Sequence, residues 1–372
     1  MESILSYGQM MVAFLSVLTI LVFVHEWGHY IVARMCGVRV DVFSIGFGPE
    51  IWGFYDKNGT RWKFSWIPLG GYVKFFGDAS EASTPGQALP SMSEEEKKEA
   101  FHYKSLAQKS AIVFAGPAVN FIFAIMIIAG MYFSYGEYVV PPVVGDVIEG
   151  GAAEEAGTQA GDRIVSIDGE EISSFRDISI HLAFKVEENV SVSVLRNAEI
   201  INLNFTLNMI DDKNILGEKL KVRQIGIKSV PLARNLVEYG FFGAIWQATI
   251  ETKNRTLQNL KGMKQMVVGD RSLKELGGPI TIARVAGKTA EISFLVLLNF
   301  AAHISIGLGM INLFPIPVLD GGHLLYYAIE AVRRKKMSLA AQEFGFKIGI
   351  ALVLSLMVFA TYNDISRQNW FN

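Results

Sequence analysis

The chain has 372 residues, of which 51% are hydrophobic and 19% are charged, and its mean hydropathy is +0.30. This composition is too apolar for an ordinary soluble protein and fits a membrane protein with one water-soluble part. The formal net charge of −2 lacks the basic excess that nucleic-acid binding requires, so no nucleic-acid partner is expected. The single cysteine, Cys36, excludes an internal disulfide, and we expect it to be a packing residue.

Uncharged stretches long enough to cross a bilayer predict four membrane-spanning helices, with the lipid bilayer as a partner. They lie at about 10–32, within 110–136, between 291 and 320, and at about 344–362. The first lacks the basic start and small-residue cleavage site of a signal peptide, so we expect it to be a retained span. Residues 241–250 are uncharged but too few to span, which predicts a helix lying on the membrane or against the protein.

The short basic run Arg333-Arg334-Lys335-Lys336 predicts the orientation of the chain. Basic loops between spans stay in the cytoplasm, so this loop is expected inside the cell. With four spans, both termini and residues 137–290 would then lie outside. Residues 33–109 would lie inside.

The first span ends in His25-Glu26-Trp27-Gly28-His29. In an HExxH helix the two imidazoles lie one turn apart on the same face, where both can hold one Zn²⁺ ion, and the glutamate between them is placed to act as a general base. An ionisable side chain at mid-membrane costs roughly 3 kcal/mol or more, so such residues usually mark a function. The alternative is a chance match whose histidines are satisfied at the membrane interface.

Between the second and third spans the pattern changes to short alternating runs, which predict strands at 143–148, 163–167, 190–194 and 200–207. Asp168-Gly169 predicts a hairpin turn, and residues 174–185 predict a helix capped by Ser174. The stretch from Gly157 to Gly169 resembles bacterial PDZ domains, which take up a peptide as an added strand. The peptide groove is expected near 145–148 and the 174–185 helix; a β insert that binds nothing is the alternative.

A catalytic zinc usually has three protein ligands, and HExxH supplies two of them. A metzincin would need a glycine and a histidine where Val32 and Met35 stand. A gluzincin-like site would take its third ligand from an acid about twenty residues after HExxH, and Glu50 lies near that position. However, residues 38–54 alternate like a hairpin rather than a helix, which argues against Glu50. The remaining candidate is Asp320, after Asn312-Leu-Phe-Pro-Ile-Pro-Val-Leu, where two prolines must break a helix at membrane depth. A structural helix end with an interfacial aspartate is the alternative.

HExxH in the first span, the PDZ-like insert and the late NxxPxPxLDG motif together resemble the site-2 protease family of intramembrane zinc metalloproteases. The nearest branch resembles the bacterial enzymes that cleave membrane-bound anti-sigma factors in the sigma-E response. The likeness covers almost the whole chain and includes three further motifs: Gly46-Phe-Gly48-Pro49, Ile67-Pro-Leu-Gly70-Gly71-Tyr-Val-Lys74 and Phe114-Ala-Gly-Pro-Ala-Val-Asn120-Phe121. One departure is a single PDZ-like unit where the best-known branch has two.

The resemblance implies a zinc metalloendopeptidase that hydrolyses peptide bonds within or near the transmembrane segments of single-pass membrane proteins. Anti-sigma factors and leftover signal peptides are the expected substrates, in regulated intramembrane proteolysis. His25, His29 and Asp320 would hold one zinc ion, with Glu26 as the base. Asn312 would contact the unwound substrate backbone, and His323 would support the ligands, with ligation of the metal as its alternative role.

An α-helical substrate hides its carbonyls in hydrogen bonds, so cleavage needs local unwinding and a strand edge on which the extended segment can pair. The segments 38–54 and 62–75 are expected to provide that edge, and glycines would let a substrate backbone approach closely. These substrate-contacting glycines are Gly46, Gly48, Gly70 and Gly71. A PDZ membrane scaffold with a structural or degenerate zinc site is the alternative function, although a structural site has no use for Glu26. A metal transporter is a weaker alternative. It would need several metal sites in series across the membrane, and the sequence offers one.

The predicted fold is a polytopic α-helical membrane protein with four transmembrane helices, a membrane-associated β-rich segment and an inserted PDZ domain of α+β type. It would lie in the bacterial inner membrane, with the PDZ domain in the periplasm and the active site toward the cytoplasm. The expected organisation is helix 1 at 1–36, a cytoplasmic loop with the β-hairpin at 37–109, helix 2 at 110–136, the PDZ domain at 137–230, an amphipathic region at 231–290, helix 3 at 291–332, a basic loop at 333–343, helix 4 at 344–363 and a tail at 364–372.

Overall fold

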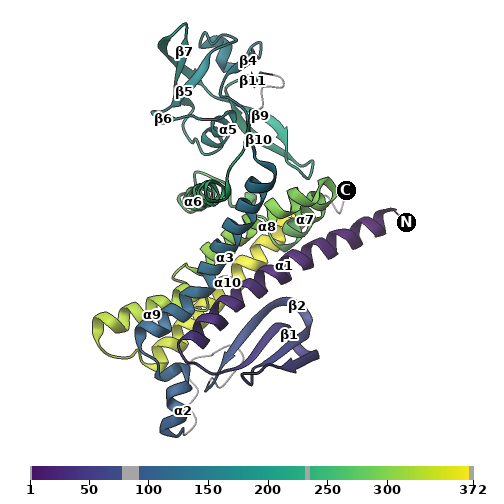
Figure 1. Cartoon of the computed structure of the whole chain (residues 1–372). Coiled ribbons are helices and arrows are strands. Elements are labelled where there is room, and N and C mark those ends of the chain that lie inside the picture. The colour runs from purple at the N-terminus through teal and green to yellow at the C-terminus, as the bar shows by residue number, and fades with distance from the viewer. Residues whose placement is uncertain (1, 78–91, 231–234, 368–372) are drawn as a thin grey trace. The chain divides into compact units, whose positions relative to one another are not determined.

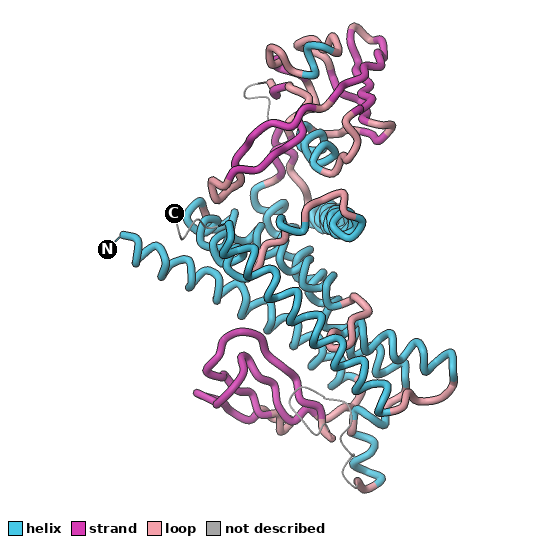
Figure 2. The backbone as a smooth tube through the Cα atoms, turned by 180° about the vertical axis from the view of Figure 1, so that it is seen from behind, coloured by secondary structure: helices cyan, strands magenta, loops and turns pink. Residues whose placement is uncertain are grey.

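The computed structural model describes residues 2–77, 92–230 and 235–367 (Figure 1). The chain divides into two compact units, one of residues 1–128, 248–259 and 272–372 and the other of residues 129–247 and 260–271. Figure 2 shows that helices dominate the first unit and that strands are gathered mainly in the second.

The first unit is built from long helices and one β-hairpin. Its elements are α1 (Glu2–Met35), β1 (Val40–Tyr55), β2 (Arg61–Phe75), α2 (Glu94–Glu99), most of α3 (Leu106–Tyr135), the middle of α6 (Phe241–Val268), α7 (Pro279–Ile292), α8 (Phe294–Asn312), α9 (Asp320–Arg333) and α10 (Leu339–Arg367).

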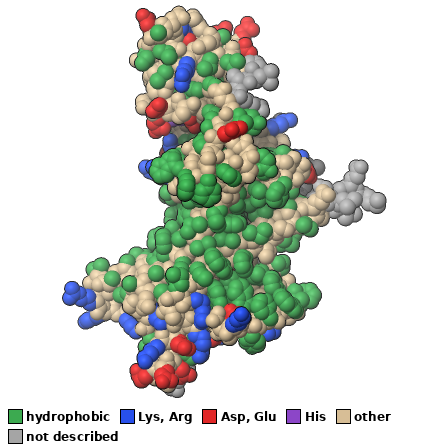
Figure 3. Space-filling view, in the orientation of Figure 1, with side chains coloured by type: hydrophobic (Ala, Val, Ile, Leu, Met, Phe, Trp, Pro, Cys, Tyr) green, Lys and Arg blue, Asp and Glu red, His purple; other side chains and the backbone are tan. Residues whose placement is uncertain are grey.

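Four helices in the described part of the chain are long and apolar enough to cross a membrane: Gly8–Met35, Leu106–Tyr135, Phe294–Asn312 and Leu339–Arg367. Their number agrees with the four predicted spans. Hydrophobic side chains cover most of the visible face of these helices (Figure 3). On α10, apolar side chains such as Leu354 and Val358 are exposed, as lipid-facing positions require.

Helix α1 ends where the sequence changes from apolar residues to Cys36-Gly37. Gly37 has a φ of +69°, its backbone N–H donates to the carbonyl of Arg34, and the N–H of Val38 donates to that of Ala33. This pair of bonds is the Schellman ending, which satisfies carbonyls that the helix leaves open and favours glycine. The chain thereby turns directly into β1.

Strands β1 and β2 form the antiparallel hairpin that the alternation predicts, with several register shifts along it. One part of the hairpin packs on α1 through Tyr30, Phe43 and Val73, and Phe43 stacks on Trp62 with ring centroids 4.2 Å apart. Other large apolar side chains of the hairpin, including Trp52 and Trp66, are exposed. An exposed set of this kind suits a membrane-contacting surface.

The predicted helix 3 at 291–332 is interrupted where the two prolines predict a break. Helix α8 ends at Asn312, a loop containing Pro315 and Pro317 follows, and α9 starts at Asp320. Proline cannot donate a backbone hydrogen bond and its ring clashes with the preceding turn, which explains the break. The loop is tightly packed, because a Cβ on Gly349 of α10 would collide with the Pro317 carbonyl and one on Gly321 with that of Phe314.

The second unit contains a four-stranded antiparallel sheet in the order β6-β5-β7-β8. Its core includes Ile167, Val192 and Phe205, with Ile178 and Leu182 from helix α5. Its elements are β3 (Glu137–Val139), β4 (Val144–Val147), α4 (Ala152–Glu155), β5 (Arg163–Ile167), β6 (Glu170–Glu171), α5 (Phe175–Ala183), β7 (Asn189–Arg196), β8 (Glu199–Thr206), β9 (Asn208–Lys213), β10 (Lys219–Gln224), β11 (Ile227–Ser229), β12 (Asn235–Val237) and the ends of α3 and α6.

Local predictions for this region agree with the structure. Ser174 caps α5 in a capping box with Asp177, and Asp168 and Gly169 take positive φ in the turn between β5 and β6. The segment 241–250, predicted as a helix that does not span the membrane, is helical and begins the 28-residue helix α6. Helix α6 carries charged residues after the uncharged stretch 241–250. Charged residues suit a helix that is not buried in lipid along its whole length.

Candidate metal centre and active site

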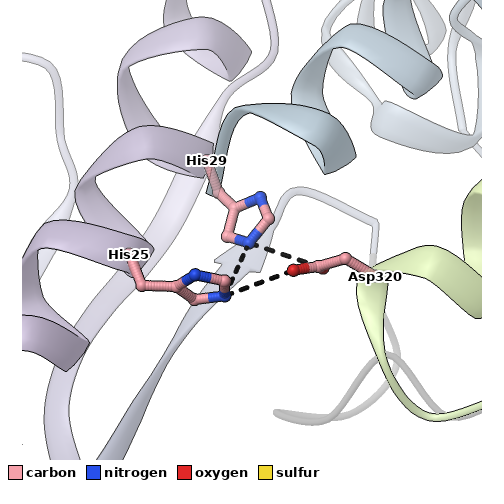
Figure 4. A group of neighbouring side chains, drawn as sticks. All are labelled: His25, His29 and Asp320. Carbon is pink, nitrogen blue, oxygen red and sulfur yellow. Dashed lines mark hydrogen bonds and ion pairs between the residues drawn. The ribbon is translucent and has the colours of Figure 1, made fainter. Parts of the chain in front are cut away.

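Helix α1 carries two histidines one turn apart, and both point toward Asp320 at the start of α9 (Figure 4). The Nε2 atoms of His25 and His29 are 3.3 Å apart. The Asp320 carboxylate lies 3.2 Å from Nε2 of His25 and 3.5 Å from Nε2 of His29. Both histidines are buried and Asp320 is half-buried.

These separations fit a zinc ion. Ligand atoms about 2.0–2.2 Å from a tetrahedral zinc lie roughly 3.3–3.5 Å from one another, and the three measured edges span 3.2–3.5 Å. Two imidazoles and a carboxylate are also a common ligand set of catalytic zinc, with one position left for water. In the described part of the chain, no other group of three or more such side chains comes together this way.

Glu26 stands on α1 between the two histidines, and strand β2 passes beside it. A Cβ built on Gly71 would lie 3.4 Å from Cγ of Glu26 and 2.6 Å from the Ser44 carbonyl. The backbone of Val73 also interacts with the Glu26 carboxylate. The β-hairpin therefore delivers a strand directly to the predicted base.

Asn312, at the last turn of α8, also reaches the centre, because its amide nitrogen lies 3.4 Å from Nε2 of His25. Two further candidate ligands, Glu50 and His323, are not part of the three-residue group. Glu50 is bound by the Arg61 side chain and is not part of the three-residue group, which removes it as the third ligand. His323 lies one turn after Asp320 and is likewise outside the group.

The predicted substrate-contacting glycines divide into two kinds. Gly46, Gly48 and Gly70 have φ of +88°, +88° and +94°, so they shape the irregular hairpin, and a Cβ on Gly46 would lie 2.6 Å from the Ile67 carbonyl. Gly71 is the one of the four whose Cβ would contact Glu26. Contact of any of them with a substrate remains a prediction.

Helix α3 contributes contacts to which the sequence analysis assigned no role. Nδ1 of His29 lies 2.9 Å from the Ile112 carbonyl, and the Asn120 amide lies 3.1 Å from Nδ1 of His25. Asn120 belongs to one of the motifs noted in the sequence and is a polar residue in an apolar span, and these two signals could have pointed to it.

An HExxH helix joined to a distant aspartate, within apolar helices long enough to cross a bilayer, is the arrangement of a membrane-embedded zinc metallopeptidase. Comparison with known proteins agrees: the model of peptidase family M50 matches residues 13–356. The chain belongs to this family, which is the site-2 protease family. It is therefore a zinc metalloprotease of the membrane, which overturns the scaffold and transporter alternatives.

Relatives match over nearly the whole chain. A protein of Brucella suis whose name describes a zinc metalloprotease is 43% identical over 357 residues, covering 95% of this chain and 94% of that protein. One of Rhizobium meliloti with the same kind of name is 44% identical over 360 residues, covering 96% of each. Metalloprotease MmpA of Caulobacter vibrioides is 36% identical over 386 residues, covering 97% of this chain and 96% of that protein.

Proposed function

We propose that this zinc metalloprotease hydrolyses peptide bonds within or next to the transmembrane segments of single-pass membrane proteins. His25, His29 and Asp320 would be the zinc ligands and Glu26 the general base. The observation that carries the proposal is the position of the ligands. Both histidines belong to the span Gly8–Met35, and Asp320 follows the loop that ends the span Phe294–Asn312.

The residues present suit peptide hydrolysis. Zinc, when bound, lowers the pKa of water to about 7 and polarises a carbonyl group. Glu26 would take the proton from the attacking water and pass it to the leaving amine. The Asn312 amide, 3.4 Å from Nε2 of His25, would donate a hydrogen bond to the scissile carbonyl as negative charge develops on its oxygen.

Strand β2 would hold the substrate. A helical segment must unwind before its carbonyls can be attacked, and an extended segment needs hydrogen-bonding partners in the bilayer. The β-hairpin brings backbone groups up to Glu26 through Gly71 and Val73. An unwound substrate strand pairing along the hairpin would thus lie beside the base.

The test separates metal binding from catalysis. His25→Ala and Asp320→Asn should lose bound zinc, whereas Glu26→Gln should keep zinc and stop cleavage of a single-pass reporter in liposomes. Glu50→Gln is the matched control, since that carboxylate pairs with Arg61 in the hairpin and should leave zinc unchanged. Full zinc occupancy in Asp320→Asn would refute the proposed ligand set.

We also propose that the insert is a PDZ domain that filters substrates, such as anti-sigma factors, on the periplasmic side of the inner membrane. Strand β4, near which the peptide groove is predicted, pairs with β11 along Val144–Val147, and this pairing takes up one of its two edges. In the described residues β11 has a strand partner on one side only, and a peptide would add to its other edge.

The filter role predicts a selective effect of removing the insert. Replacing residues 139–228 by a short flexible linker should preserve cleavage of a substrate already trimmed outside the membrane. Discrimination against the untrimmed substrate should relax. A zinc-loaded deletion protein that cannot cut the trimmed substrate would show that the insert is needed for catalysis itself.

A further inference from the structure

The two histidines of the metal centre face it with the same ring atom. Nε2 of His25 and Nε2 of His29 both lie within 3.5 Å of an Asp320 oxygen. A neutral imidazole that ligates through Nε2 carries its proton on Nδ1. Each ring therefore needs a hydrogen-bond acceptor at Nδ1, because that acceptor selects the tautomer and holds the ring in orientation.

Helix α3 supplies this acceptor for His29. Nδ1 of His29 lies 2.9 Å from the backbone carbonyl of Ile112, in a buried contact. A carbonyl can only accept, so Nδ1 of His29 is the donor and its Nε2 lone pair is free for a metal. The backbone thus settles the state of this ring without help from any side chain.

The corresponding neighbour of His25 is a side chain from the same helix, two turns later. The Asn120 amide lies 3.1 Å from Nδ1 of His25, and Asn120 is fully buried. In the orientation described, its nitrogen faces the ring and its oxygen has no hydrogen-bond partner. Rotating the amide by half a turn places its oxygen against Nδ1 of His25 instead. The amide makes one hydrogen bond to His25 in either orientation. A proton on Nδ1 therefore selects the orientation in which the oxygen faces the ring.

Close packing of α1 on α3 makes these contacts possible. A Cβ on Gly28 would lie 2.6 Å from the Ala115 carbonyl, and one on Gly116 would lie 2.9 Å from Cε1 of His25. Asn120 is itself held in place, since Ser305 of α8 donates to its backbone carbonyl at 2.8 Å. The amide is therefore presented to His25 from a backbone that two neighbouring helices restrain.

We propose that Asn120 is a positioning residue of the metal centre: its side-chain oxygen accepts the Nδ1 proton of His25 and so aims the Nε2 lone pair at the metal. This inference rests on the proposed role of His25 as a zinc ligand. The site would then be oriented by one helix through two acceptors, the Ile112 carbonyl for His29 and the Asn120 amide for His25.

The test measures zinc affinity of the purified full-length protein by competition with a chromogenic chelator, independently of proteolysis. Asn120→Leu removes the acceptor at similar volume and should weaken zinc binding by about 10–100-fold, the usual effect of losing a partner of a ligating histidine. Asn120→Asp keeps an acceptor and should retain zinc. Ile122→Ala is the control, because it shortens an exposed side chain on the same helix and should leave zinc affinity unchanged.

Two outcomes would overturn the inference: wild-type affinity in Asn120→Leu, or an equal loss in Asn120→Asp and Asn120→Leu. If His25→Ala has lost zinc in the same assay, such a result leaves the proposed ligand set intact. Wild-type affinity in His25→Ala would instead refute the ligand set. Should Asn120→Leu fail to fold, ¹⁵N labelling of the six histidines in the zinc-loaded wild type decides, since a His25 Nδ1 without a proton would contradict the role of Asn120.

Discussion

The amide nitrogen of Asn312 lies 3.4 Å from Nε2 of His25, although 287 positions separate the two residues in the chain. The contact joins the end of α8 to the HExxH helix. It places a hydrogen-bond donor next to the atom through which His25 would hold zinc. A donor at that point is suited to the oxygen of a carbonyl under attack.

Replacing Asn312 should therefore damage turnover more than metal binding. We expect Asn312→Leu to keep zinc and to lower kcat by about 10²–10³-fold, as loss of one donor to a developing oxyanion does. Ile311→Ala, at the exposed neighbouring position, should leave kcat near wild type. Zinc analysis and single-turnover cleavage of a reporter measure the two quantities, and an unchanged kcat in Asn312→Leu would exclude the proposed role.

The close approach of α3 to the metal centre predicts that Gly116 cannot carry a side chain. A Cβ there would collide with His29 and come within 2.9 Å of His25, so Gly116→Ala should lose zinc. Gly130→Ala is the control on the same helix, because nothing lies within 4 Å of its Cβ and alanine raises helix propensity by about 1 kcal/mol. Retention of zinc in both variants would show that α1 and α3 separate easily.

The proposed orientation can be checked by cysteine labelling in a Cys36→Ala background. Asn197, in the exposed turn between β7 and β8, should become reactive as cysteine only from outside the cytoplasm. Lys335, in the basic loop between α9 and α10, should be reactive only from inside, as the distribution of basic loops predicts. Labelling of position 197 from the cytoplasm would reverse the topology.

Acid should lower the folding stability of the insert by breaking the ion pair between Arg196 and Asp162. Both guanidinium nitrogens Nε and Nη2 of Arg196 donate to the Asp162 carboxylate at 2.7 Å, and this holds the pKa of Asp162 below its ordinary value. A carboxyl whose folded-state pKa is depressed stabilises the fold above its unfolded pKa of about 4, and that contribution is lost as the pH falls through the folded value.

Asp162→Asn should lower the free energy of unfolding of the insert by about 2–3 kcal/mol near pH 7 and flatten its acid dependence. Hydrogen exchange of β7 in the full-length protein, corrected for intrinsic rates, measures both effects. Glu171→Gln, an exposed acid on β6, is the control. Equal protection of the β7 amides from exchange in Asp162→Asn and the wild type would show that the ion pair does not contribute to the stability of the insert.

Local pattern was enough to predict much of this protein, because periodicity, turn residues and caps act over a few neighbouring positions. The four spans, the hairpin 40–75, the cap at Ser174 and the pairing of His25 with His29 on one helix face are of this kind. Helix limits were less predictable: α6 continues past its uncharged start, whereas the end of α8 at Asn312 agrees with the break that the two prolines predict. Packing and the Pro315–Pro317 break set those limits.

What only the tertiary structure decided is which distant groups meet at the two histidines. The sequence already favoured Asp320 over Glu50, and the structure brings Asp320 to the histidines. Only the structure shows that Gly71 brings β2 to Glu26 and that Asn120 faces His25 from α3. None of these contacts follows from spacing along the chain, since each depends on how closely two helices or a helix and a strand approach. Small residues at the points of contact, such as Gly28, Gly71 and Gly116, allow that approach, so these contacts exist only once the helices have packed.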